Sequence, residues 1–256
     1  MCCGRFYLLT LLPLLALGGC GRVDRLPTAA APSDANVKAS SLKESLRGLS
    51  RSHGPANFYP LDIGNRWEYA DESSKTIISE GGRAEKHGSW TRKTVLTRTE
   101  VINGREYMRE EDELDDPSSP TGSPYTSVRW LRQDRSGLYE VSIVLPDSHL
   151  SAETQLLAYP LHKGATWVMT ELPHTTAEVE RMEVLRTPAG SLPAWRIRIR
   201  NGGHLPQEES WAWYGRTGYL GARTHLDVGK PDSAGHIEII EDQSESLTRL
   251  SISRGE

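Results

Sequence analysis

The histidines of this chain do not have the spacing of a metal or catalytic site. The sequence holds eight of them, at positions 53, 87, 149, 162, 174, 204, 225 and 236. No pair stands four residues apart beside a glutamate, as on a zinc-protease helix, although separate strands could bring His204 and His225 together. The sequence also lacks a Gly-x-Ser-x-Gly nucleophile elbow and a glycine-rich phosphate loop. We therefore predict no catalytic residue, no metal site and no cofactor.

Carboxylates are concentrated in one segment, Glu110 to Asp116, where six of the seven residues are acidic. The segment lacks the alternating aspartate spacing of a calcium loop, and Pro117 and Pro120 follow it. We therefore expect a solvated acidic loop. A glycosidase needs two carboxylates facing each other across a cleft, whereas the neighbours Glu110 and Glu111 would point to opposite faces of a strand. A catalytic pair would have to come from separate strands.

A basic row and an aromatic pair are the remaining candidates for binding chemistry. Arg196, Arg198 and Arg200 alternate with apolar residues, so on one face of a strand they offer positive charge to lipid headgroups or an acidic polymer. Glutamates at 178, 180 and 183 favour cross-strand ion pairs on a solvated face instead. Trp211 and Trp213 would share a face, and such pairs stack on sugars or, more commonly, fill a core.

The first 20 residues have the pattern of an export signal. Arg5 supplies a positive charge, and the apolar stretch after it is shorter than the about 20 residues that a membrane span needs. Leu17, Gly18, Gly19 and Cys20 end the stretch and resemble the lipobox of bacterial lipoproteins. That resemblance implies cleavage before Cys20 and attachment of acyl groups, palmitate among them. An ordinary signal peptide with a cysteine at its cleavage site is the alternative.

Removal of residues 1–19 from the 256 leaves 237, enough for one large or two small domains. The 30 basic residues become 29 through the loss of Arg5, against 34 acidic ones, which disfavours a nucleic-acid binder. Cys2 and Cys3 leave too, so we expect neither a disulfide nor a cysteine nucleophile. Residues 20–55 are rich in Ala, Pro, Ser and Thr and predict a flexible, disordered tether, with one short amphipathic helix around 41–49.

From Phe58 onward, apolar residues recur with a period of two, which predicts β-strands. Asn103-Gly104 between two such runs is a strong hairpin signal. Further hairpins are expected around 134–137, 187–190 and 216–218, with the last strands at 237–240 and 247–252. The sequence therefore predicts an all-β fold, an antiparallel meander of hairpins that forms an open barrel, a half-barrel or a sandwich.

A nine-residue motif occurs twice, at 59–67 and at 159–167. The shared residues are Tyr59, Pro60, Leu61, Gly64 and Trp67 in the first copy, and Tyr159, Pro160, Leu161, Gly164 and Trp167 in the second. A second echo aligns Trp130 and Gly137 with Trp211 and Gly218. We interpret these repeats as two similar halves, 56–150 and 157–256, of a β domain spanning 56–256. A duplicated packing device is one interpretation, in which Gly permits a turn and Trp opens the next strand facing inward, and a binding cleft between the halves is the other.

Three features together resemble a group of bacterial lipoproteins of unknown function. They are the repeated motif, the turn Thr187-Pro188-Ala189-Gly190-Ser191, and the segment from Trp213 to Leu220. The resemblance covers most of 157–226 and, more loosely, 58–141. It implies a β-rich fold and an envelope location, without a chemistry. Such sheets are also similar, more distantly, to the half-barrels of lipoprotein carriers, which cup an acyl chain.

We therefore predict a lipid-anchored envelope protein, not an enzyme, whose β domain binds a protein partner or an apolar ligand. Its expected contacts are the membrane, through the N-terminal lipid, and that partner or ligand, with no nucleic acid. Gly21 in place of aspartate after Cys20 resembles sorting to the outer membrane of enteric-type bacteria, facing the periplasm. The alternatives are an envelope-polymer hydrolase with carboxylates from separate strands, and a half-barrel carrier of acyl chains or lipoproteins.

Overall fold

The computed structural model describes residues 58–79, 82–115, 124–144, 149–150, 152–171, 174–202, 208–228 and 238–252. These residues belong to one compact unit of the chain. The predicted signal peptide 1–19, with Leu17, Gly18 and Gly19, the attachment residue Cys20, the tether 20–55 and its helix at 41–49 lie outside the described residues. Within the described residues, no helix has the length and hydropathy needed to cross a bilayer.

Thirteen antiparallel strands form one sheet in the described part of the chain. They are β1 (Arg66–Ser79), β2 (Gly82–Ile102), β3 (Arg105–Asp115), β4 (Tyr125–Gln133), β5 (Gly137–Val144), β6 (His149–Leu150), β7 (Thr154–Ala158), β8 (Thr166–Thr170), β9 (Thr175–Thr187), β10 (Gly190–Asn201), β11 (Glu208–Gly215), β12 (Gly218–Val228) and β13 (Glu238–Ser251). The strand order is β6-β5-β4-β3-β2-β1-β13-β12-β11-β10-β9-β8, and β7 pairs with β5. The all-β, antiparallel prediction is confirmed, as a single continuous sheet instead of a two-sheet sandwich.

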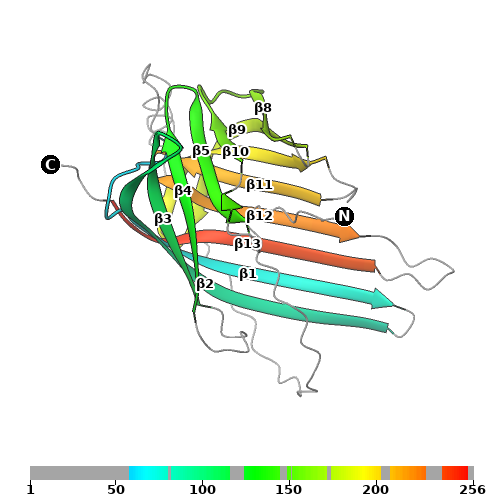
Figure 1. Ribbon diagram of the computed structural model, residues 1–256. Coiled ribbons are helices and arrows are strands. Elements are labelled where there is room, and N and C mark those ends of the chain that lie inside the picture. The colour runs from blue at the N-terminus through cyan, green and yellow to red at the C-terminus, as the bar shows by residue number, and fades with distance from the viewer. Residues whose placement is uncertain are drawn as a thin grey trace. The chain divides into compact units, whose positions relative to one another are not determined.

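The sheet curls until its two ends approach each other. β7 pairs with β5 near one end and lies against β8 at the other. Trp167 of β8 donates its Nε1–H to the carbonyl oxygen of Gln155 in β7 at 3.0 Å. Figure 1 shows β3, β4 and β5 crossing in front of the long strands β1, β12 and β13. The sheet is therefore a nearly closed barrel, and its concave side holds the core.

The turns that join the strands follow local sequence chemistry. Asn103 and Gly104 link β2 to β3 with φ values of 51° and 77°, as a type I′ turn requires. The other three predicted hairpins are also present, as β4–β5, β9–β10 and β11–β12. The prediction of two separate last strands is wrong, because one strand, β13, runs through both. The polar middle of β13, Glu241–Ser246, pairs with β1 without interruption.

Period-two alternation sends both apolar and charged side chains to the concave side. Trp67, Tyr69 and Asp71 of β1 are buried there, whereas Arg66 and Glu72 are exposed. Other strands bury charged groups too, notably an arginine in β2 and glutamates in β3 and β13. A buried charge is stable only when it is paired and hydrogen-bonded, so the contacts of these groups decide what the interior does.

Candidate functional site

The two copies of the nine-residue motif make turns with the same backbone hydrogen bonds. Gly64 N–H donates to the carbonyl of Leu96 in β2, and Gly164 N–H donates to the carbonyl of Val179 in β9, both at 2.8 Å. In each copy, the residue after the glycine accepts a bond from that same partner, at 3.0 and 2.9 Å. Both glycines have a positive φ, 91° and 83°, which a side chain would strain.

The tryptophans that end the two motifs pack the interior. Trp67 is 0% exposed, lies 5.1 Å from Tyr59 between ring centres, and donates its Nε1–H to the carbonyl of Thr217 at 2.7 Å. A Cβ at Gly218 would come within 3.1 Å of Trp67 Nε1, so only glycine fits closely there. In the first copy, Tyr59, Pro60 and Trp67 are buried, and Leu61 and Gly64 are half-buried. In the second copy, Leu161 and Trp167 are buried, Tyr159 is half-buried, and Pro160 and Gly164 are exposed.

Arg92 of β2 is the centre of a buried ionic cluster. Its Nε–H donates to Oε1 of Glu245 in β13 at 2.7 Å, and its Nη1 lies 3.5 Å from Oδ1 of Asp112 in β3. Tyr219 donates its hydroxyl to Oε2 of Glu245 at 2.6 Å, and Thr94 donates to Asp112 at 2.5 Å. Burial alone would lower the pKa of Arg92, but Glu245 and Asp112 raise it well above its usual value. The guanidinium therefore stays charged, with carboxylates on two sides.

Asp71 of β1 adds a second acid to this cluster. It stands directly opposite Glu245 in the strand register and is 5% exposed. Its Oδ2 has no hydrogen-bond partner among the described residues. Burial, and then the charge of Glu245, raise the pKa of Asp71 to about 8, against a lowering by Arg92. Burial and the nearby carboxylate therefore favour the protonated form of Asp71.

A second buried ion pair lies beside the first, on β3 and β4. Glu110 is 0% exposed and accepts hydrogen bonds on both oxygens, from the Tyr59 hydroxyl at 2.5 Å and from Nε of Arg129. Arg129 also donates through Nη1 to Glu140 of β5 at 2.9 Å. Burial raises the pKa of Glu110, while Arg129 lowers it. Both oxygens of Glu110 are thus already engaged by protein donors, and neither is directed at a substrate.

The prediction of a solvated acidic loop at 110–116 is wrong. Residues 110–115 form the second half of β3, and Asp116 lies outside the described residues. Alternation turns Glu110 and Asp112 inward, while Glu111 and Glu113 take the outer face, as predicted for two adjacent glutamates. Composition indicated solvation, but arginines from two neighbouring strands neutralise the inward acids.

The outer face of the sheet carries one contact twice, once in β1–β5 and once in β8–β12. Trp130 of β4 donates its Nε1–H to Glu100 of β2 at 2.8 Å, and Trp213 of β11 donates its Nε1–H to Glu183 of β9 at 2.6 Å. In both cases the arginine two residues before the glutamate also donates to it, at 2.7 Å. The bond from Trp130 lowers the pKa of Glu100. At Glu183, burial raises the pKa, but the hydrogen bonds from Trp213 and Arg181 lower it, so the pKa of Glu183 is also below its usual value.

These contacts place Trp213, and not Trp211, in the position of Trp130. The predicted alignment is off by two residues because the two hairpin turns differ in length. Gln133 pairs with Leu138 across one turn, whereas Gly215 pairs with Gly218 across the other. Trp211 lies instead beside the Arg196 guanidinium, 4.9 Å from its ring centre.

The basic row of β10 is neutralised on the outer face, as predicted. Arg196 lies 2.8 Å from Glu180 and Arg200 lies 3.1 Å from Glu178, both between nitrogen and carboxylate oxygen. Arg198 pairs with Glu209 of β11. With these partners, the row offers little free charge to an anionic surface or polymer.

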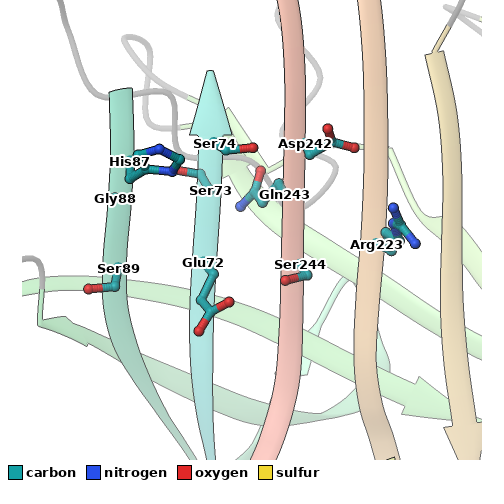
Figure 2. Close-up of a pocket in the computed structure, with 10 residues that line it drawn as sticks. All are labelled: Glu72, Ser73, Ser74, His87, Gly88, Ser89, Arg223, Asp242, Gln243 and Ser244. Atoms are coloured by element: carbon teal, nitrogen blue, oxygen red, sulfur yellow. The ribbon is translucent and has the colours of Figure 1, made fainter. Parts of the chain in front are cut away.

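A shallow hollow of about 560 Å³ lies on the outer face of β1, β2, β12 and β13. Figure 2 labels its ten lining residues, most of which are polar. Ser89, Glu72, Ser244 and Arg223 form one row across the four strands. The sequence analysis missed this site, because its residues come from segments up to 172 positions apart, Glu72 to Ser244, and form no local motif.

The histidines do not gather in the described residues. His225 of β12 lies 2.9 Å from Asp242 of β13, between Nδ1 and Oδ1. No group of three His, Cys, Asp or Glu side chains in the described ranges is arranged to hold a metal ion. His204 lies outside the described residues, so its approach to His225 stays a prediction.

No protein-family model matches this sequence, and the search of curated proteins gives no match. Among solved structures, the chain is similar to an exported-protein candidate of YmcC-like fold from Bacteroides fragilis, with 11% identity and a TM-score of 0.41 over 77% of this chain and 100% of that one. It is also similar to a lipoprotein candidate from Parabacteroides distasonis, with 12% identity and a TM-score of 0.37 over 77% and 99%. A candidate outer-membrane lipoprotein-sorting domain from Vibrio parahaemolyticus gives 8% and 0.21 over 82% and 91%. These values are too low to transfer a residue role or a ligand.

Proposed function

We propose that this chain is a lipoprotein of the cell envelope, held to the membrane by acyl groups on Cys20, whose β domain is a non-catalytic binding module. The observation that carries the proposal is Leu17-Gly18-Gly19-Cys20 at the end of a short apolar run, with no cysteine after it in the sequence. Gly21 supports sorting to the outer membrane, with the domain in the periplasm.

The contacts of the buried carboxylates support a binding module over a hydrolase. A general acid, base or nucleophile must direct an oxygen at the substrate. Both oxygens of Glu110 and both of Glu245 are engaged by protein donors. Asp71 holds its proton but is 5% exposed, on the barrel interior. These acids therefore serve packing in our proposal, and not the chemistry of an envelope hydrolase.

The packing of the interior argues against an apolar ligand held inside the barrel. An acyl carrier encloses its ligand in an apolar cup. In β9, β10 and β12 the inner side chains Val179, Ile197 and Leu220 are 0–1% exposed, and Trp67 and Tyr59 fill the space near β1. Side chains at this burial leave the core close-packed. We therefore place recognition on the outer surface of the domain.

Metabolic labelling with alkynyl palmitate, followed by membrane fractionation, tests the anchor. We expect the wild-type chain to be labelled and to sediment with outer membranes. Cys20→Ala should lose the label and remain soluble in the periplasm or unprocessed at the inner membrane. Cys3→Ala is the matched control, because it also removes a thiol but lies in the segment that cleavage discards. Labelling of the Cys20→Ala chain would refute the proposal.

A further inference from the structure

Two charged residues of the outer hollow, Glu72 and Arg223, have no side-chain partner among the described residues, in contrast to the arginines of β10. On the outer face of β10, Arg196 and Arg200 pair with glutamates. In the hollow, neither Glu72 nor Arg223 has an ion pair or a side-chain hydrogen bond to any described residue. Its hydrogen-bonding capacity is therefore available to a ligand.

The strand register places these two charges on either side of one strand. Ser244 of β13 stands directly between Glu72 of β1 and Arg223 of β12. Neighbouring strands lie about 4.8 Å apart, so the two charged residues are on the order of 10 Å apart at the backbone. The short outward side chains Ser74, Ser89 and Ser244 leave space above the sheet, and this space is the hollow (Figure 2).

The lining indicates which ligands fit. An apolar ligand finds no large apolar side chain among the lining residues. A strong anion or cation finds one guanidinium and one free carboxylate, since Asp242 is already in contact with His225. A neutral molecule with many hydroxyls can donate to Glu72, accept from Arg223 and exchange hydrogen bonds with the serines between them. The volume lies within the range of small-ligand sites.

We propose that this hollow binds a neutral, hydroxyl-rich ligand, a short oligosaccharide chain. Glu72 accepts from ligand hydroxyls at one end, Arg223 donates to ring or hydroxyl oxygens at the other, and Ser244 contacts the stretch between them. The inference rests on the proposed binding role of the β domain and names the class of ligand.

Isothermal titration of the full chain in detergent tests the inference. The probes are the neutral sugars chitotetraose and maltotetraose, with inorganic phosphate, palmitate and an acetylated, amidated Ser-Gly-Ser-Gly peptide as competing classes. We expect saturable binding of at least one sugar. Glu72→Gln and Arg223→Gln should each weaken it about tenfold, as loss of a charge-assisted hydrogen bond does. Ser244→Leu should abolish it by filling the hollow.

Glu68→Gln and Arg66→Gln are the matched controls, because both residues lie on the same face of β1 but do not line the hollow. They should leave the affinity unchanged. Binding of neither sugar, binding insensitive to all three hollow variants, or binding of phosphate, palmitate or the peptide alone would overturn the inference. The anchor test at Cys20 does not depend on these outcomes, so failure here and failure of the lipoprotein proposal are distinguishable.

Discussion

The inner faces of β1–β5 and β8–β12 use the same strand arrangement for opposite chemistry. In the first segment, one cross-strand row reads Leu96, Glu110, Arg129. In the second, the corresponding row after the matching turn reads Val179, Ile197, Ala212. The next row differs in the same way, with Thr94 and Asp112 in β2 and β3 but apolar residues in β9 and β10. These inner rows carry charged groups in the first segment and only apolar side chains in the second.

The comparison distinguishes the contacts that fix the strand arrangement from the side chains that fill the interior. The two segments share the turn hydrogen bonds of Gly64 and Gly164 and the outer contacts of Trp130 and Trp213. Turn geometry fixes the strand register, and the register alone decides which positions face inward. An inner row can then be a neutralised ion pair or an apolar cluster, provided that it fills the space. We propose that the segments are duplicated halves on this basis.

The largest expected effect comes from breaking the ionic row. Arg129→Met leaves Glu110 buried and unpaired, which should lower the free energy of unfolding by about 3–5 kcal/mol. Glu110→Leu should lower the free energy of unfolding by a similar amount, because Arg129 then lacks this buried carboxylate. The double variant, which makes this row apolar like its counterpart in β9–β11, should cost less than either single variant. Urea unfolding of all four proteins measures the coupling.

Arg181→Met is the control, since this arginine is exposed and lies on the outer face. It should leave stability nearly unchanged. Additive costs in the double variant would contradict the view that the ionic row and the apolar row are interchangeable fillings.

Shortening the two motif tryptophans compares the segments at their shared turn. Trp67→Ala should cost about 3–5 kcal/mol, because a fully buried indole leaves a large cavity. Trp167→Ala should cost less, since Trp167 is 8% exposed against 0% for Trp67. Thermal unfolding followed by circular dichroism measures both. A stable Trp67→Ala protein that has lost binding would instead mean that the motif lines a site.

Asp71 makes the ionic segment sensitive to pH in a direction that can be calculated. Its folded pKa of about 8 lies above the usual value of 3.8, so the folded state holds a proton that the unfolded chain releases. The wild type therefore loses stability relative to Asp71→Asn as the pH rises from about 4 to about 8, by up to about 1.4 kcal/mol per pH unit. Above that range the difference should level off.

Glu171→Gln is the matched control for Asp71, because it occupies the same place in the second motif, four residues after the tryptophan, and its side chain is 84% exposed. Its stability difference from the wild type should be flat with pH. A flat difference for Asp71→Asn as well, measured by urea unfolding from pH 4 to 9, would remove the argument that Asp71 is held protonated.

The smallest effect is expected at the contacts that the segments share. Trp130→Phe and Trp213→Phe each remove one N–H donor to a partly exposed glutamate and should each cost about 1 kcal/mol. The lowered pKa values of Glu100 and Glu183 mean that these contributions are present above the usual glutamate pKa and are lost as the pH falls below it. Thermal melts at pH 7 and pH 3 check this, and clearly unequal costs would weaken the proposed equivalence.

Local sequence chemistry predicted much of the fold. A type I′ turn needs positive φ at both central residues, so Asn103-Gly104 could be placed without tertiary information. The row of arginines in β10 could likewise be paired with the glutamates of β9, because a short hairpin joins the two strands. Both inferences involve residues close in sequence.

Contacts between residues far apart in the sequence could not be predicted. Arg92 and Glu245 are 153 positions apart and meet because β1, the neighbour of β2, pairs with β13 from the C-terminal end of the described residues. The signal that was missed is the alternation from Trp67 and Tyr69 to Asp71, which already places a carboxyl on the buried face. Likewise, no local pattern links Glu72 to Arg223 across β13. The acidic residues 110–115 of β3 were wrongly predicted to be a solvated loop for the same reason, because their composition does not show which arginines pair with them.

The intact mass of the protein purified from its own membranes is the most direct test of the central claim, that this β domain is lipid-anchored. We predict a chain that begins at Cys20 and carries the added mass of acyl groups, with fragmentation placing that mass on Cys20. A mature chain that begins elsewhere, or that begins at Cys20 with an unmodified thiol, would contradict the account.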